Sequence, residues 1–155
     1  VRSAIGELLY QLKYGNDQSV MEAITATASS FVRSKSWCID VVIPVPASRY
    51  RSFQPVVGLA KQLAEDLGVA FGGGHVVKTR NIPELKNVFD FDARAKLLAD
   101  AFQVDRTKVE ARHVLLFDDL YRSGATMNAV SHVLKASGKA AKVYVLALTM
   151  TRKHR

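Results

Sequence analysis

Two adjacent acids and the loop that follows them are the residues of this chain best suited to chemistry. Asp118 and Asp119 follow an apolar run, and after two spacer residues the chain reads Arg-Ser-Gly-Ala-Thr at 122–126. Paired carboxylates can bind a diol or a hard cation. Hydroxyls and backbone N–H groups at the start of a helix can bind a phosphate. The spacing therefore indicates a ligand with a diol or metal at one end and a phosphate at the other.

The residues around the acids indicate how the fold positions them. Val114 to Phe117 form a continuous rather than alternating apolar run, which predicts a strand buried on both faces. Asp118 and Asp119 are then expected at the carboxyl end of that strand, where open α/β sheets bind ligands. The alternative is that the acids only end a strand and Ser123 only caps a helix. The complete run of strand, acid pair and hydroxyl loop favours a ligand site.

The remaining elements are expected to alternate between helices and strands. Periodicity predicts helices over 1–14, 20–32, 55–67 and 94–98, and a further helix from the loop at 122–126 to about 137. Strands are predicted over 39–45, 75–78, 101–104 and 142–149. This alternation favours right-handed crossovers and a doubly wound α/β fold with a mostly parallel sheet. The stretch 79–92 shows little periodicity and is expected to be a functional or mobile loop.

Length and composition indicate one domain over 1–155, with N-terminal helices over 1–35 and a core over 39–150. With 48% hydrophobic residues the chain is not expected to be disordered. Cys38 is the only cysteine, which excludes a disulfide framework or a multi-cysteine zinc site within this chain. No apolar run approaches the roughly 20 residues of a membrane span, so neither a span nor a signal peptide in the first residues is expected. These features fit a cytoplasmic location.

The charge balance suits an anionic partner. Lys and Arg number 22 against 14 Asp and Glu, a net charge of +8, which fits a phosphate ligand and also a nucleic acid. Arg49, Arg51, Lys78 and Arg80 fall in expected loops rather than along one helical stripe. The charge therefore favours phosphate binding over duplex DNA binding, but composition alone does not separate them.

The run from 114 to 126 resembles the ribose-5-phosphate-binding signature of type I phosphoribosyltransferases. The resemblance implies a Rossmann-like doubly wound fold and phosphoribosyl pyrophosphate, or another ribose-5-phosphate compound, as ligand. The acid pair Asp118 and Asp119 would be the catalytic residues that meet the ribose hydroxyls. The loop around the 5-phosphate would consist of Arg122, Ser123, Gly124, Ala125 and Thr126.

A second resemblance is narrower, to the ComF-type, competence-associated branch of that family. It rests on the segments Pro44-Val-Pro46, Arg-x-Arg-x-Phe-Gln at 49–54 and Leu-Lys-Tyr-Gly at 12–15. Ser52 and Gln54 stand where that branch has glycine and asparagine. A four-cysteine zinc module typical of the branch is not in this chain. The residues implied for pyrophosphate binding are Ala47, Ser48 and Arg49, and those implied for a mobile flap are Lys78 and Arg80.

The resemblance also implies a mechanism. Mg²⁺ would bridge the pyrophosphate and the ribose hydroxyls, with Asp118 and Asp119 as its only candidate protein ligands. Loss of pyrophosphate would leave an oxocarbenium-like sugar, and loop 79–92 would close over it. Arg122 stands where purine-salvage members often have an acid, and arginine cannot accept a proton from the base. A purine-salvage reaction of that type is therefore not expected, and the acceptor stays open.

Three functional classes follow from the sequence. The first is a phosphoribosyltransferase that uses an unidentified acceptor. The second is a non-catalytic sensor of phosphoribosyl pyrophosphate or a nucleotide. The third is a ComF-type accessory protein in DNA uptake or processing, for which nucleic acid would be the partner. A homodimer is a further candidate assembly.

Overall fold

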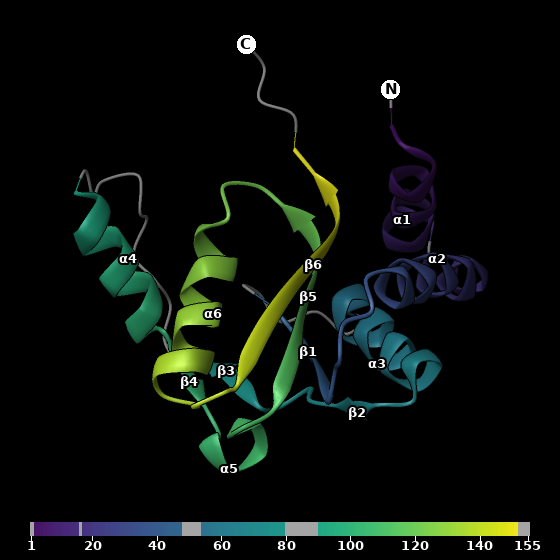
Figure 1. Ribbon diagram of the computed structural model, residues 1–155. Helices are drawn as coiled ribbons and strands as arrows, with labels where there is room; N and C mark the ends of the chain where they lie inside the picture. Colours follow the sequence, from purple (N-terminus) through teal and green to yellow (C-terminus); the bar gives the residue numbers. More distant parts are fainter. Residues whose placement is uncertain (1, 16, 48–53, 80–89, 152–155) are drawn as a thin grey trace.

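The core of the protein is a parallel sheet between two layers of helices (Figure 1). The computed structural model describes residues 2–15, 17–47, 54–79 and 90–151. The sheet has the spatial order β2-β1-β5-β6, and each neighbouring pair is parallel. Its strands are β1 (Val41–Pro44), β2 (Ala70–Phe71), β5 (His113–Tyr121) and β6 (Lys142–Met150). The predicted α/β class with a mostly parallel sheet is confirmed.

Strand β5 is the centre of this arrangement, and its composition explains why. Val114 and Leu116 belong to the apolar cluster on one face of the sheet, whereas Leu115 and Phe117 belong to the cluster on the other. All four side chains are buried. Because successive residues of a strand point to opposite faces, a strand covered on both faces needs a continuous apolar run.

The two helical layers divide the chain (Figure 1). One face of the sheet is covered by the elements that precede and follow β1, namely α1 (Ala4–Tyr14), η1 (Gln18–Val20), α2 (Met21–Ser34) and α3 (Pro55–Leu67). The other face is covered by α4 (Phe91–Asp100), α5 (Arg106–Val109), α6 (Ala125–Ala136) and the antiparallel pair β3 (Val76–Lys78) and β4 (Phe102–Val104).

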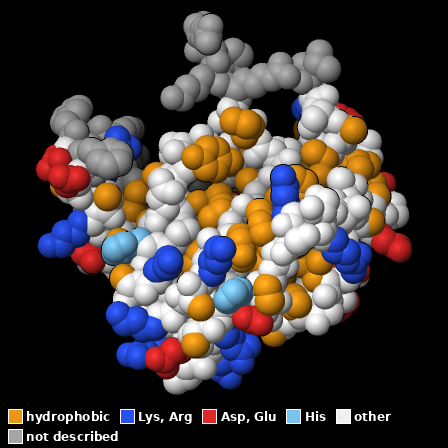
Figure 2. Space-filling view, viewed as in Figure 1, with side chains coloured by type: hydrophobic (Ala, Val, Ile, Leu, Met, Phe, Trp, Pro, Cys, Tyr) orange, Lys and Arg blue, Asp and Glu red, His pale blue; other side chains and the backbone are white. Residues whose placement is uncertain are grey.

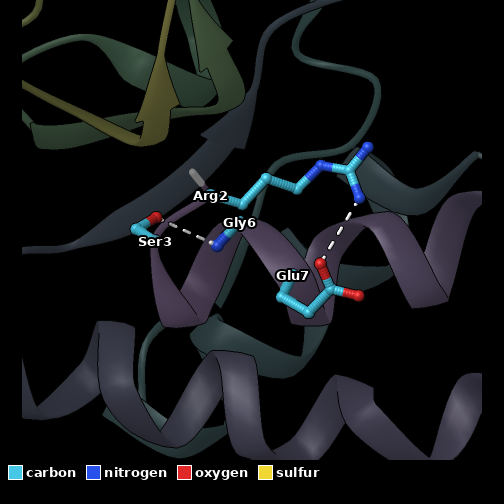
Figure 3. Close-up of polar contacts among 4 residues, drawn as sticks. All are labelled: Arg2, Ser3, Gly6 and Glu7. Carbon is cyan, nitrogen blue, oxygen red and sulfur yellow. Dashed lines mark hydrogen bonds and ion pairs between the residues drawn. The ribbon is translucent and has the colours of Figure 1, made fainter.

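Local contacts fix the start of α1, the helix that contributes a residue to the site described below. The Ser3 hydroxyl accepts a hydrogen bond from the Gly6 N–H at 3.2 Å, and Arg2 pairs with Glu7 at 3.3 Å (Figure 3). A serine at this position satisfies an N–H group that the helix itself leaves unpaired. Leu9 and Leu12 are buried against the sheet, so α1 is held by its apolar face.

Several predicted boundaries are wrong. Strand β5 continues to Tyr121, so the acid pair lies within the strand rather than after it. Helix α4 begins at Phe91 and is longer than predicted, so the stretch expected as a loop already ends at residue 90. Residues 80–89 of that stretch lie outside the described residues. Strands β3 and β4 pair with each other in a separate antiparallel sheet. The short elements β2, α5 and η1 were not predicted, since each is too brief to show periodicity.

Across the described ranges, no helix combines the length and the apolar character that a membrane crossing would need.

Candidate functional site

A cleft opens at the carboxyl ends of β1 and β5. Its volume is about 490 Å³. Three separate parts of the chain line it: the segment after β1, the first turn of α3, and the continuous stretch from Asp118 to Met127. Lys13 of α1 is a further lining residue. The cleft is therefore where a parallel sheet is expected to bind ligands.

The different lengths of the strands explain why the cleft forms there. The last residue pair between β1 and β5 is Pro44 with Phe117. The Val45 N–H still donates to the Phe117 carbonyl at 2.8 Å, after which the chain turns away from β5. Strand β5 remains paired with β6 as far as Tyr121. In the described part of the chain, the edge of β5 that faced β1 is therefore left without a neighbouring strand from Asp118 onward.

The acid pair sits at this step in the sheet. In the alternation of the strand, Asp118 shares a face with Leu116, and Asp119 shares the opposite face with Phe117. The Asp119 N–H donates to Asp118 Oδ1 at 2.8 Å. The Asp119 carbonyl accepts a hydrogen bond from the Thr149 hydroxyl at 2.8 Å. The backbone that carries both carboxylates is thus fixed by β6 and by the pair itself.

Burial and charge change the proton affinity of one of the two acids. Desolvation raises the pKa of Asp118 to about 7, and the negative charge of Asp119 acts in the same direction. Burial disfavours the charged form of a carboxyl group, and a like charge nearby adds to that effect. Asp118 therefore changes its charge near neutral pH, and a bound cation would favour its ionised form.

Asp119 has a cationic partner that the sequence did not identify as functional. The Lys13 ammonium forms an ion pair with Asp119 Oδ2. The side chains are 25% and 11% exposed, so the pair lies partly inside the protein. In the sequence, Lys13 belongs to the Leu-Lys-Tyr-Gly segment that resembles the ComF-type branch, and that resemblance implies no role for it. The sequence does hold one indication of this position. Leu12 belongs to the predicted apolar face of the helix, so the neighbouring Lys13 is expected near the sheet.

The hydroxyl loop leads from β5 into α6, as predicted. Gly124 has a φ of 79° and immediately precedes the helix. The Ala125 N–H donates to the Ser123 hydroxyl at 3.3 Å. Arg122, Ser123 and Thr126 are exposed and line the cleft. The first turn of α6 thus presents N–H groups and hydroxyls in the same cleft as the acid pair, an arrangement suited to a phosphate.

The other predicted site residues are placed as follows. Ala47 lines the cleft, next to Pro46. Ser48, Arg49 and Arg80 lie outside the described residues. Lys78 ends β3, where it pairs with Phe102, and it is not among the described residues that line the cleft. The cleft therefore unites the predicted acid pair with the predicted phosphate loop.

The acid pair fits a metal carried by a ligand better than a metal held by protein alone. Within the ranges that the structure describes, His, Cys, Asp and Glu side chains form no group of three or more that could hold an ion. Mg²⁺ commonly binds to one or two carboxylates and to the phosphates of a substrate. Asp118 and Asp119 supply two carboxylates beside a loop suited to phosphate, which is the donor set that such an ion needs.

Basic side chains also gather away from the cleft. They lie at the opposite end of the sheet, over α5 and the turn that leads into β6 (Figure 2). Backbone hydrogen bonds join this region, since the Ala111 N–H donates to the Lys139 carbonyl at 2.9 Å and the Ala141 N–H donates to the Arg112 carbonyl at 2.9 Å. The exposed basic residues there are Arg106, Lys108, Arg112, Lys139 and Lys142. Asp105 and Glu110 are exposed among them.

The similarity to solved structures identifies the fold of this chain as that of the type I phosphoribosyltransferases. Adenine phosphoribosyltransferase from Saccharomyces cerevisiae matches with a TM-score of 0.61 and 16% identity, over 88% of this chain and 71% of that one. The enzyme from Trypanosoma brucei, in complex with AMP, pyrophosphate and ribose-5-phosphate, matches with a TM-score of 0.54 and 19% identity, over 86% and 53%.

Among curated proteins, the chain is similar to competence protein ComFC of Bacillus subtilis (strain 168). The two are 27% identical over 139 residues, which are 88% of this chain. The matched region is 56% of the length of ComFC, so this chain spans little more than half of that relative. No protein-family model matches the sequence. The similarity agrees with the ComF-type resemblance seen in the sequence.

Proposed function

We propose that the protein binds phosphoribosyl pyrophosphate, or another ribose-5-phosphate compound, with Mg²⁺ in this cleft. We further propose that it transfers the phosphoribosyl group to an acceptor and releases pyrophosphate. The observation that carries the proposal is the single cleft that contains both the acid pair at 118–119 and the start of α6. The fold shared with phosphoribosyltransferases supports it.

Each part of the cleft has a role in this proposal. The first turn of α6 binds the 5-phosphate through its N–H groups and the hydroxyls of Ser123 and Thr126. Asp118 and Asp119 accept hydrogen bonds from the ribose hydroxyls and orient the sugar. Mg²⁺, when bound, neutralises charge on the pyrophosphate. The protein contributes position and electrostatics rather than a covalent intermediate.

The reaction itself breaks one bond and forms one. The pyrophosphate leaves C1 of the ribose with the bonding electrons, and the ring takes on positive, oxocarbenium-like character. A lone pair of the acceptor then forms the new bond to C1, and the acceptor loses a proton if it carried one. The ionised acid pair stabilises the developing positive charge, so Asp118 acts in its ionised form.

A second candidate function is that of a ComF-type accessory protein that binds nucleic acid. The similarity to a competence protein favours it, as does the group of basic side chains at the end of the sheet opposite the cleft (Figure 2). In this candidate the cleft senses a phosphoribosyl compound without turnover. The salt dependence of DNA binding tests it, because contacts to DNA phosphates make affinity fall steeply with salt.

The test of ligand binding compares two ligands on one variant. Asp119→Asn removes a charge that would meet the ribose but leaves the α6 turn unchanged. Calorimetric affinity for phosphoribosyl pyrophosphate with Mg²⁺ should fall, while affinity for inorganic phosphate should change little. Glu65→Gln, an exposed residue of α3, is the control for loss of one negative charge. Equal weakening of both ligands would contradict the ribose role of Asp119.

Turnover needs a separate assay. Pyrophosphate release from phosphoribosyl pyrophosphate is measured with candidate acceptors and with wild-type protein or Asp118→Asn. Release that depends on an acceptor and on Asp118 supports a transferase. Tight binding without release would leave the sensor as the function of this cleft.

A further inference from the structure

The Lys13–Asp119 pair differs from the other ion pairs described in the structure. Arg2–Glu7 and Arg106–Glu110 join side chains that are about half exposed, at 54% and 49% and at 56% and 51%. Lys13 and Asp119 are 25% and 11% exposed. Exposed pairs contribute little because water screens them, whereas a partly buried pair interacts more strongly. The ammonium of Lys13 is therefore a substantial part of the electrostatic environment of the acid pair.

The pair also joins two elements that the fold holds firmly. Lys13 lies in the last turn of α1 and follows Leu12, whose side chain is fully buried. At the other end of the pair, the Asp119 carbonyl is bonded to Thr149 of β6. Helix α1 itself lies beside β6, since a Cβ on Gly6 would be 3.8 Å from the Thr149 methyl group. A packed helix thus delivers the ammonium to the cleft.

This position makes Lys13 a competitor for the carboxylate. An ammonium beside Asp119 satisfies the carboxylate oxygen that a metal ion would need, and its positive charge repels a second cation. A divalent cation can bind to Asp119 Oδ2 only if Lys13 withdraws, and the ammonium weakens its binding to the whole carboxylate while it stays. Lys13 lines the same cleft, so its ammonium can then turn toward an anionic ligand there.

We propose that Lys13 is a counter-ion built into the site, which holds Asp119 until a divalent cation carried by a pyrophosphate ligand displaces it. The identity of that ligand rests on the proposed function. Each charged group keeps a partner of opposite charge in this exchange. The cation binds to the Asp119 carboxylate in place of Lys13, and the released ammonium faces the phosphates of the ligand. A cation or a phosphate alone achieves only half of this exchange. Lys13 therefore favours ligands that bring the two together.

The test uses Mn²⁺ alone as the probe, followed by its electron paramagnetic resonance signal. Lys13→Gln removes the competitor and should tighten Mn²⁺ binding at least about tenfold relative to wild type. Lys13→Arg keeps the positive charge and should bind as weakly as wild type. Lys135→Gln, at an exposed position in α6, makes the same change in net charge and should also match wild type. Equal affinity in Lys13→Gln and wild type, or weak binding in both, would overturn the proposal.

A second measurement needs no variant, in case Lys13→Gln does not fold. Acetylation of lysine amines in the wild-type protein is followed by mass spectrometry with and without saturating Mg²⁺. Displacement by the ion should accelerate labelling of Lys13 and leave Lys135 unchanged. Unchanged labelling of Lys13 would show that the lysine only fastens α1 to the sheet.

These results are separable from those for the proposed function. Binding of phosphoribosyl pyrophosphate without any effect of Lys13 on Mn²⁺ would remove the counter-ion role and leave the proposed function. Tighter Mn²⁺ binding in Lys13→Gln, without binding of phosphoribosyl pyrophosphate by wild type, would support the counter-ion role and contradict the proposed function.

Discussion

The ring of Tyr121 covers Gly124 so closely that no side chain fits between them. A Cβ on Gly124 would lie 2.8 Å from the Tyr121 Cζ. The φ of Gly124 is also positive, at 79°, a conformation that costs other residues energy. The backbone conformation thus favours glycine in this loop, and a side chain there would also have to displace the exposed Tyr121 ring. Tyr121 links the end of β5 to the start of α6.

Gly124→Ala should therefore disturb the turn that presents the N–H groups of α6. We expect a loss of unfolding free energy of more than about 1 kcal/mol, because ring displacement adds to the backbone cost. Binding of inorganic phosphate, followed by calorimetry, should weaken in parallel. Gly68→Ala has a similar φ of 68° but open space around it, and should lose about 1 kcal/mol only. Equal losses of unfolding free energy in the two variants would show that displacing the Tyr121 ring does not destabilise the protein.

The raised pKa of Asp118 predicts a specific pH dependence of stability. An aspartate with a folded pKa of about 7 binds its proton more tightly in the folded than in the unfolded protein. Its destabilising effect is absent below about pH 4, grows between about pH 4 and 7, and is complete above that range. Asp118→Asn should therefore be more stable than wild type at pH 8, by about 1–3 kcal/mol, and similar near pH 4. Urea unfolding at both pH values measures it. A difference that does not vary with pH would contradict the assignment.

Leu12 should determine whether α1 stays in place. Its side chain is fully buried, and Leu12→Ala should lower the free energy of unfolding by about 2–5 kcal/mol. Hydrogen exchange in α1 should rise, because the helix depends on this contact for its position. Leu8→Ala, at a partly buried position in the same helix, should lose less. Unchanged exchange in α1 after Leu12→Ala would show that other contacts suffice.

The parts of the fold that the sequence predicted are those set by local pattern. The continuous apolar run of β5 and the Gly-Ala-Thr start of α6 each reflect their immediate environment, and both were predicted in the right place. The length of β5 was not predicted, because its last residues are kept in the strand by pairing with β6 and not by their own character. Asp118 and Asp119 are polar, so the local pattern ended the strand too early.

Lys13 is the site residue that the sequence did not predict, and the reason is again a contact between distant parts of the chain. The ion pair of Lys13 with Asp119 joins the first helix to a strand near the end of the chain, and no spacing rule connects such distant positions. Only packing of Leu9 and Leu12 on the sheet brings the lysine to the cleft. The resemblance to the ComF-type branch included Lys13 but implied no role for it.

In the proposed function, one cleft binds both the phosphate and the ribose of the same ligand. The most direct measurement is a crystal structure of the protein with phosphoribosyl pyrophosphate and Mg²⁺. We predict density for the 5-phosphate at the first turn of α6, with the ribose hydroxyls at Asp118 and Asp119. Ligand bound elsewhere on the protein, or a phosphate at α6 whose ribose points away from the acid pair, would contradict the claim.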